Sequence, residues 1–328
     1  MEMNRRALYN SLRMNWVLDP TLEVKAWQVE DYRAIPLDQL FERLEDMGIR
    51  LDKTSFTGFA NEVDNPEDLT ETFLHDSSEE MEVQDEVYLI IFELWRRLLP
   101  EKHCLSFLCD EIDHQIHLYD QGQVGTGEEI ADTLANLQVV LDENTDQGAD
   151  PHEAFDCINS GCANDLECFL HDFISEKIDD CNYSYATELL EGFGPYLRDI
   201  KWFEFLRTRL MGVNDPDEAN ERVKRLISDQ QGEPDLEFNL EVLSFLVSVG
   251  DRETFEHLAK QSAELLQVED DFQALVSISA DFYHRLDCEQ VENDLQTLLK
   301  QRKKRYSNEK FNVQDPHLAA FLKILSSY

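Results

Sequence analysis

Apolar residues recur at helical spacing along almost the whole chain, and this periodicity constrains the fold more than any other feature. The chain also contains only 12 glycines and 9 prolines in 328 residues. These fractions lie below the usual values of roughly 7% and 5%, which disfavours turn-rich β architectures. We therefore predict an all-α protein of stacked antiparallel helical hairpins, in an α-solenoid-like array or a multi-helix bundle that could form two lobes.

Polar breaks in the periodicity divide the sequence into three regions. These are an N-terminal helical region (1–120), a central helical region (128–229) and a C-terminal helical-hairpin region (235–328). The acidic stretch 76–86 lacks an apolar face, so we predict a solvated loop there. The linker-like segment 229–235 suggests that two lobes meet near Gln230.

Several segments have clear helix limits. The stripe in 37–47 ends at Gly48, a residue typical of helix C-termini, and the apolar segment 87–99 predicts a buried helix. Two helical hairpins are predicted from 237–249 with 253–266 and from 269–285 with 288–304. Their turns lie 36 residues apart, close to the period of two-helix repeats, although no particular repeat family is indicated.

The charge balance limits the classes of partner. The chain has 69 Asp and Glu against 29 Lys and Arg, a formal net charge of −40. With 42% hydrophobic residues it is too apolar for a disordered acidic tail. Because phosphate backbones and anionic lipids repel such a surface, we expect no direct nucleic-acid or membrane binding. Adaptation to a salty habitat is an alternative origin of the acidity.

The N-terminus and the cysteines indicate the compartment. The first residues show no apolar segment like a secretory signal, and none of the seven cysteines forms a Cys-x-x-Cys pair. We therefore predict a reduced, cytoplasmic protein with ordinary buried thiols.

One segment resembles the calcium-binding loop of EF-hand proteins. Oxygen-bearing side chains occupy loop positions 1, 3, 5, 9 and 12, namely Asp142, Asn144, Asp146, Asp150 and Glu153. The resemblance implies a calcium site, but Gln147 stands where the loop requires glycine. The alternative is a helix N-terminus capped by Asp150, with Pro151 in its first position.

A second candidate metal site lies on one predicted helix face. Asp110, Asp113, His114 and His117 follow the i, i+3, i+4, i+7 rule, and such carboxylate and imidazole groups could hold a divalent metal. The opposite face of this helix is an apolar stripe. The alternative is therefore that the polar face is simply exposed to water.

Two further features concern protein partners. We place Tyr196, Trp202 and Phe205 on one aromatic helix, which is either central in a bundle or lines a groove for a partner's apolar side chains. The only dense basic run, Lys300 and Arg302 to Arg305, suits the negative end of a helix. It could instead be an address signal or a latch onto the acidic body.

No complete catalytic motif and no cofactor-binding motif is found. We therefore predict a non-enzymatic adaptor or chaperone-like module that binds a basic or amphipathic protein segment. Two alternatives stay open: a nucleic-acid mimic that sequesters a basic partner, and a metal-dependent enzyme that uses the Asp110–His117 face. The sequence does not indicate an oligomeric state.

Overall fold

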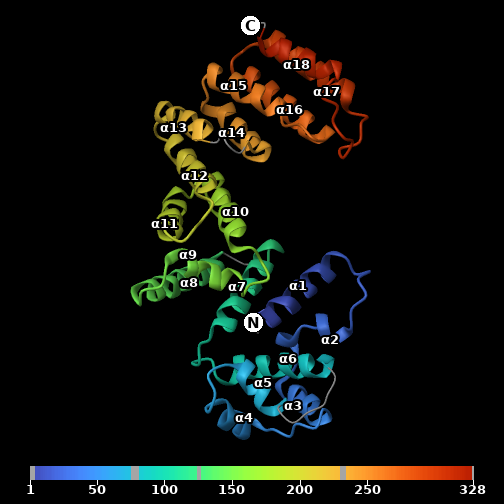
Figure 1. Cartoon of the computed structure of the whole chain (residues 1–328), viewed down its shortest axis with the longest axis vertical. Helices are drawn as coiled ribbons and strands as arrows, with labels where there is room; N and C mark the ends of the chain where they lie inside the picture. The colour runs from blue at the N-terminus through green and yellow to red at the C-terminus, as the bar shows by residue number, and fades with distance from the viewer. Residues whose placement is uncertain (1–3, 75–80, 124–126, 230–233, 327–328) are drawn as a thin grey trace. The chain divides into compact units, whose positions relative to one another are not determined.

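The computed structural model describes residues 4–74, 81–123, 127–229 and 234–326 (Figure 1). Within these ranges it has eighteen α-helices and one short 3-10 helix, and the only extended pairing is an isolated bridge between Val268 and Lys310. The all-α prediction is confirmed. No helix in the described part of the chain combines the length and the apolar character that crossing a bilayer requires.

The chain folds into two compact units. The N-terminal unit comprises residues 1–170 and 195–197, and the C-terminal unit comprises residues 171–194 and 198–328. The division into regions 1–120, 128–229 and 235–328 stays a prediction. Gln230, near which two lobes were expected to meet, lies outside the described residues.

The helices of the N-terminal unit are α1 (Asn4–Leu18), α2 (Ala26–Val29), the 3-10 helix (Tyr32–Ala34), α3 (Leu37–Asp46), α4 (Lys53–Ala60), α5 (Pro66–Leu74), α6 (Met81–Leu98), α7 (Leu105–Asp120), α8 (Glu128–Asp146) and α9 (Pro151–Asn159). Helix α3 ends as predicted, because Gly48 has φ +87°, a conformation that glycine adopts without strain. Helix α6 packs against α3, α4, α5 and the 3-10 helix. Its residues 87–95 are all buried, which confirms the predicted buried helix.

The predicted acidic loop 76–86 is wrong for residues 81–86, because α6 begins at Met81. The other residues of that stretch, 76–80, lie outside the described part of the chain. Val83 packs against the N-terminal core, and Asp85 accepts a hydrogen bond of 2.8 Å from the Tyr9 hydroxyl. These two contacts give an acidic segment a helical face that its own sequence does not reveal.

Helix α10 (Leu166–Asp179) begins in the N-terminal unit and continues into the C-terminal unit. The helices that follow are α11 (Tyr183–Phe193), α12 (Ile200–Gly212), α13 (Pro216–Asp229), α14 (Leu236–Val249), α15 (Arg252–Ala263), α16 (Glu269–Arg285), α17 (Glu289–Arg302) and α18 (Pro316–Ser326). Both predicted hairpins are confirmed as α14 with α15 and α16 with α17, and α14 also packs against α16. The repeat interpretation of their spacing stays a prediction.

Candidate functional site

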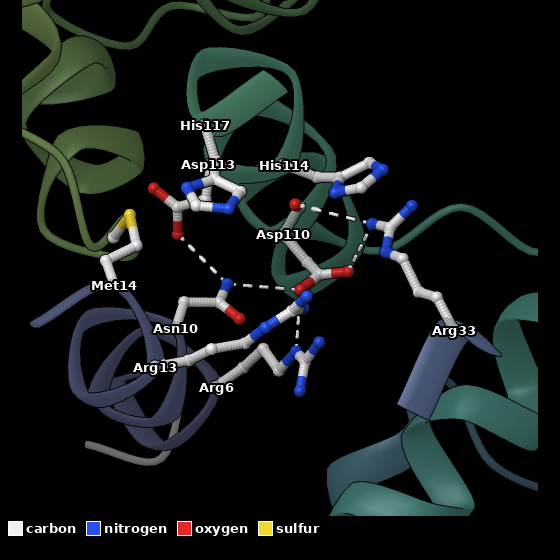
Figure 2. Close-up of a pocket in the computed structure, with 9 residues that line it drawn as sticks. All are labelled: Arg6, Asn10, Arg13, Met14, Arg33, Asp110, Asp113, His114 and His117. Carbon is white, nitrogen blue, oxygen red and sulfur yellow. Dashed lines mark hydrogen bonds and ion pairs between the residues drawn. The ribbon is translucent and has the colours of Figure 1, made fainter. Parts of the chain in front are cut away.

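The polar face of α7 is turned toward α1, not toward water. Asp110 is 3% exposed and accepts hydrogen bonds from Arg6 Nε at 2.6 Å and Arg33 Nη2 at 2.7 Å (Figure 2). Asp113 is equally buried. The alternative of a water-exposed face is therefore wrong for both carboxylates, because hydrogen-bond donors from distant parts of the sequence compensate their burial.

The two arginines determine the charge state of Asp110. Burial alone raises the pKa of a carboxyl group, but Arg6 and Arg33 outweigh it and hold the pKa of Asp110 well below its usual value. Asp110 is therefore a carboxylate at neutral pH. Arg33 also pairs with Glu111 at 3.0 Å, so the charges of the two arginines are balanced by two carboxylates.

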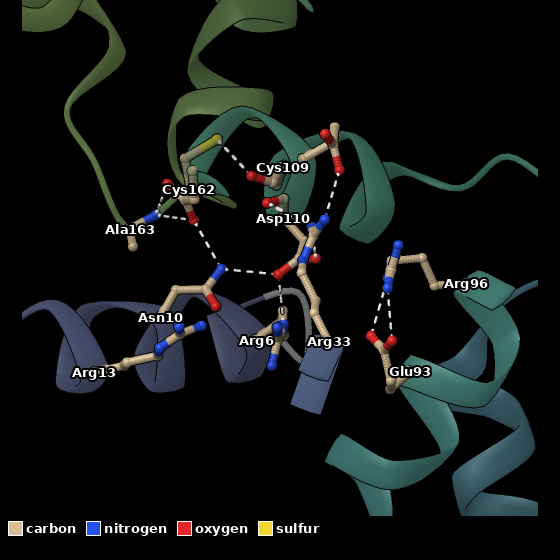
Figure 3. A network of polar contacts seen from close by, with 12 residues as sticks. Arg6, Asn10, Arg13, Arg33, Glu93, Arg96, Cys109, Asp110, Cys162 and Ala163 are labelled. Carbon is tan, nitrogen blue, oxygen red and sulfur yellow. Dashed lines mark hydrogen bonds and ion pairs between the residues drawn. The ribbon is translucent and has the colours of Figure 1, made fainter. Parts of the chain in front are cut away.

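Asp113 has a different set of partners. Its carboxyl accepts hydrogen bonds from the backbone N–H of Ala163 at 2.9 Å and of Asn164 at 3.1 Å. Asn10 Nδ2 donates to Asp113 at 3.1 Å (Figure 2) and to Asp110 at 3.1 Å (Figure 3), and so joins α1 to both carboxyls. Burial raises the pKa of Asp113 in spite of these bonds. The side chain thus fixes the turn between α9 and α10.

The two histidines of this face are half-buried. Burial and the neighbouring Arg33 lower the pKa of His114, while burial and Arg13 lower the pKa of His117. Both rings are therefore neutral at pH 7. Together with the arginines they line a pocket of about 30 Å³, here called the α1–α7 pocket, whose lining residues are Arg6, Asn10, Arg13, Met14, Arg33, Asp110, Asp113, His114 and His117.

The structure offers no geometric support for a metal at this face. Among the described residues, no three His, Cys, Asp or Glu side chains are arranged to hold a metal ion. Beside Asp110, the guanidinium groups of Arg6 and Arg33 occupy the positions in which a cation would approach the carboxylate.

The loop required for the calcium hypothesis does not form. Helix α8 continues through Asp146, so Asp142, Asn144 and Asp146 are helical and do not belong to a loop. Asp150 instead accepts hydrogen bonds from the backbone N–H groups of His152 at 3.0 Å and Glu153 at 3.2 Å. With Pro151 as the first residue of α9, this confirms the alternative of a capped helix N-terminus.

The predicted aromatic partner surface is not exposed. Helix α12 begins at Ile200, so Tyr196 precedes it and belongs to the N-terminal unit, where its hydroxyl donates to Asp142. Phe205 is buried against Phe238, with 5.5 Å between ring centroids, and Trp202 is partly buried on the same ring at 4.9 Å. The alternative of a helix central in its bundle fits Phe205 and Trp202.

The basic run divides into a buried residue and exposed neighbours. Arg302 is 1% exposed and donates to Glu269 at 2.7 Å through Nε and to Asp315 at 2.8 Å through Nη1. It thereby links α17 to the start of α16 and to the residue before α18. Lys300 and Arg302 lie in the last turn of α17, as the helix-end interpretation predicts, and the buried contacts of Arg302 also fit an internal latch.

The cysteines differ from the expectation of uniformly buried thiols. Cys109 is buried, whereas Cys157, Cys168 and Cys181 are exposed. Burial raises the pKa of the half-buried Cys104 thiol. That thiol is consequently a poor nucleophile at neutral pH.

A groove that the sequence analysis missed runs between α7, α8 and the segment that connects α6 to α7. We call it the α7–α8 groove. Its volume is about 800 Å³, and its lining residues are Arg96, Pro100, His103, Cys104, Leu105, Phe107, Leu108, Glu111, Asp132, Thr133, Asn136, Val139, Val140, Glu143 and Asn144. All of them belong to the N-terminal unit.

The groove has an apolar floor and an acidic rim. Leu105, Leu108 and Val140 are half-buried in it, and Val139 is 53% exposed. The carboxylates of Asp132 and Glu143 are exposed at one side, and that of Glu111 lies at the other. Arg96, the one arginine of the lining, is engaged by Glu93 at 2.6 Å.

The sequence did carry a signal for this groove. Asp132, Asn136, Val139, Val140 and Glu143 follow the i, i+4, i+7, i+8, i+11 rule and form a second stripe on α8, beside the buried one. The buried stripe consists of Ile130, Leu134, Leu137 and Leu141. Val139 and Val140 are the apolar residues of this second stripe, so α8 carries apolar side chains outside its buried stripe.

Comparisons of the chain with protein-family models, with curated proteins and with solved structures found no match.

Proposed function

We propose that this protein is a non-enzymatic, cytoplasmic adaptor or chaperone-like module, and that the α7–α8 groove binds an amphipathic helical segment with basic residues. The observation that carries the proposal is the combination of an apolar floor with an acidic rim in one groove. Helix-in-groove recognition uses these two elements: apolar side chains of the ligand enter the groove, and its charges meet the rim.

The shape of the groove favours a helix over a compact ligand. Its sides are two packed helices, so the apolar residues form rows along α7 and α8. A helical ligand presents its own apolar side chains in a row at i, i+3, i+4 and i+7, which matches such a trough. The floor therefore supplies affinity for two or three apolar anchors of the ligand.

The charges favour a basic ligand. Asp132 and Glu143 are exposed beside the floor. The formal net charge of the chain, −40, has the same sign. Complementary charge speeds encounter and disfavours acidic competitors, and salt weakens both effects. We therefore expect binding that is strongest at low ionic strength.

A single charged substitution in the floor tests the proposal. The probe is a fluorescein-labelled 18-residue peptide of leucine and lysine with leucines at helical spacing, and its affinity is measured by fluorescence anisotropy. Val139→Asp places a carboxylate in the floor and removes apolar area worth roughly 1.5–3 kcal/mol when it is buried. We expect the affinity to fall by about tenfold or more.

The matched control is Val313→Asp, because Val313 is 68% exposed and lies far along the sequence in the C-terminal unit. This variant has the same change of charge and should bind the peptide like the wild type. A second control is a peptide of the same composition with the leucines scrambled, which should bind weakly. Equal affinities of the two valine variants would rule out the α7–α8 groove as the binding site.

A further inference from the structure

Two cysteines that are distant in the sequence lie against each other in the N-terminal unit. Cys109 belongs to α7, and Cys162 lies in the turn between α9 and α10. The Sγ of Cys162 is 4.0 Å from the backbone carbonyl oxygen of Cys109 (Figure 3). A disulfide requires the two Cα atoms to lie within about 7 Å of each other. The side chain of Cys162 already reaches the main chain of Cys109, as such a bond would need.

The thiol of Cys109 is directed at the same turn. It donates to the carbonyl oxygen of Ile158, which is 3.5 Å from its Sγ. The sulfur also lies over Gly161, because a Cβ at position 161 would be only 2.8 Å from it. Gly161 does not have the positive φ that favours glycine, so its missing side chain provides space for the Cys109 sulfur. Both sulfurs therefore belong to one contact between α7 and the α9–α10 turn.

Hydrogen bonds hold this contact in place. Asp113, on α7, accepts from the backbone N–H groups of Ala163 at 2.9 Å and Asn164 at 3.1 Å, the two residues that follow Cys162. A hydrogen bond between the two thiols, burial, and the negative charges of Asp113 and Asp110 raise the pKa of Cys162. That thiol is therefore neutral at pH 7 and reacts slowly, but its partner is already beside it.

We propose that Cys109 and Cys162 form a disulfide when the protein is exposed to a small-molecule disulfide such as oxidised glutathione, and that the bond ties α7 to the α9–α10 turn. In a cytoplasmic protein such a bond is typically transient and responds to oxidants. The two cysteines are 53 positions apart, so the bond closes a long loop. This inference does not depend on the function of the α7–α8 groove.

The reaction has two exchange steps. Cys162 reacts first, because it is half-buried whereas Cys109 is 2% exposed. It gives its proton to water, and its thiolate attacks one sulfur of oxidised glutathione and releases one glutathione thiolate. Cys109 then loses its proton, attacks the Cys162 sulfur of the mixed disulfide and expels the second glutathione thiolate. The two leaving thiolates take up the two protons, so the protein loses two electrons and oxidised glutathione gains them.

The test is oxidation of the folded, full-length protein with oxidised glutathione at pH 8, followed by alkylation of the remaining thiols and digestion after acidic residues. Trypsin would not separate the two cysteines, because no lysine or arginine occurs between Lys102 and Lys177. We expect mass spectrometry to identify Cys109 linked to Cys162 as the main cross-link. The melting temperature should rise by about 5 °C or more, and dithiothreitol should reverse the rise.

Cys157→Ser is the matched control, since Cys157 is exposed and lies nearby on α9. This variant should keep the cross-link and the rise in melting temperature, whereas Cys162→Ser should lose both. Circular dichroism of the reduced variants establishes that each one is folded. A main product in which Cys162 carries glutathione and Cys109 stays a thiol would overturn the proposal. Equal melting temperatures of the oxidised and reduced protein would overturn it as well.

Discussion

Replacement of Arg302 by leucine is expected to lower the free energy of unfolding of the C-terminal unit by about 3–5 kcal/mol. The reason is that Arg302 is the cation for two buried carboxylates, those of Glu269 and Asp315. Without it, both negative charges are left in the interior with only Arg305, which is 40% exposed and 3.2 Å from Asp315. Urea denaturation followed by circular dichroism measures the change.

The control for this prediction is Lys303→Leu, which removes a positive charge from the next residue, an exposed one. Hydrogen exchange then localises the effect: protection should fall in α16, α17 and α18 and remain in α6. If Arg302→Leu were as stable as Lys303→Leu, the buried latch would not contribute to the fold.

Asp110→Asn is expected to destabilise the N-terminal unit by a similar amount, about 3–5 kcal/mol at pH 7. The substitution would keep the shape of the side chain but leave Arg6 without an anion and Arg33 with only Glu111, at 3.0 Å. Because these three positions connect α1, the 3-10 helix and α7, we expect the loss to appear in the docking of α1. Asp146→Asn, an exposed position on α8, is the matched control.

The loss at Asp110 should depend on pH with a defined sign. The pKa of Asp110 is lower in the folded protein than the value of about 3.9 in the unfolded chain, because Arg6 and Arg33 outweigh burial. Such a group stabilises the fold fully above the unfolded pKa, and its contribution is lost as the pH falls toward the folded pKa. The stability difference between wild type and Asp110→Asn should therefore be constant from pH 5 to 8 and shrink below about pH 4. A difference independent of pH down to pH 2 would contradict this assignment.

Local signals in the sequence identified the helices well. Gly48 after α3, Asn65 before α5 and Asp215 before α13 act within one turn of their own helix, so the sequence alone contains their effect. The turn of the α14–α15 hairpin was predictable for the same reason, since Asp251 caps α15 by accepting from the backbone N–H of Thr254.

The environment of polar residues could not be predicted in this way. Asp110 and an exposed aspartate look alike in sequence, and what distinguishes them is Arg6, which lies 104 residues away. The burial of Arg302 could not be predicted for the same reason. In the sequence it belongs to a basic segment, and only the structure shows its ion pairs with Glu269 and Asp315. Tyr196 was wrongly assigned to α12, which begins at Ile200. The residues between them, 197–199, include no glycine or proline that would have indicated a break.

The α7–α8 groove could be predicted from the sequence only in part. The second stripe of α8 could be recognised from its spacing, but whether a neighbouring helix covers it depends on packing. Leu105 and Leu108 belong to the apolar stripe of α7 opposite the Asp110 face, and they line the groove, half-buried. Whether a neighbouring element covers these side chains depends on tertiary packing, which no local pattern encodes.

The most direct test of the central claim is a map of where the leucine–lysine peptide binds. The protein is labelled at its leucine and valine methyl groups, and the methyl NMR spectrum is recorded with the helical peptide and with its scrambled control. We expect the largest shifts at Leu105, Leu108, Val139 and Val140, and none of comparable size with the scrambled peptide. Shifts that leave these four residues unchanged, or that are the same for both peptides, would contradict binding of an amphipathic helix in the α7–α8 groove.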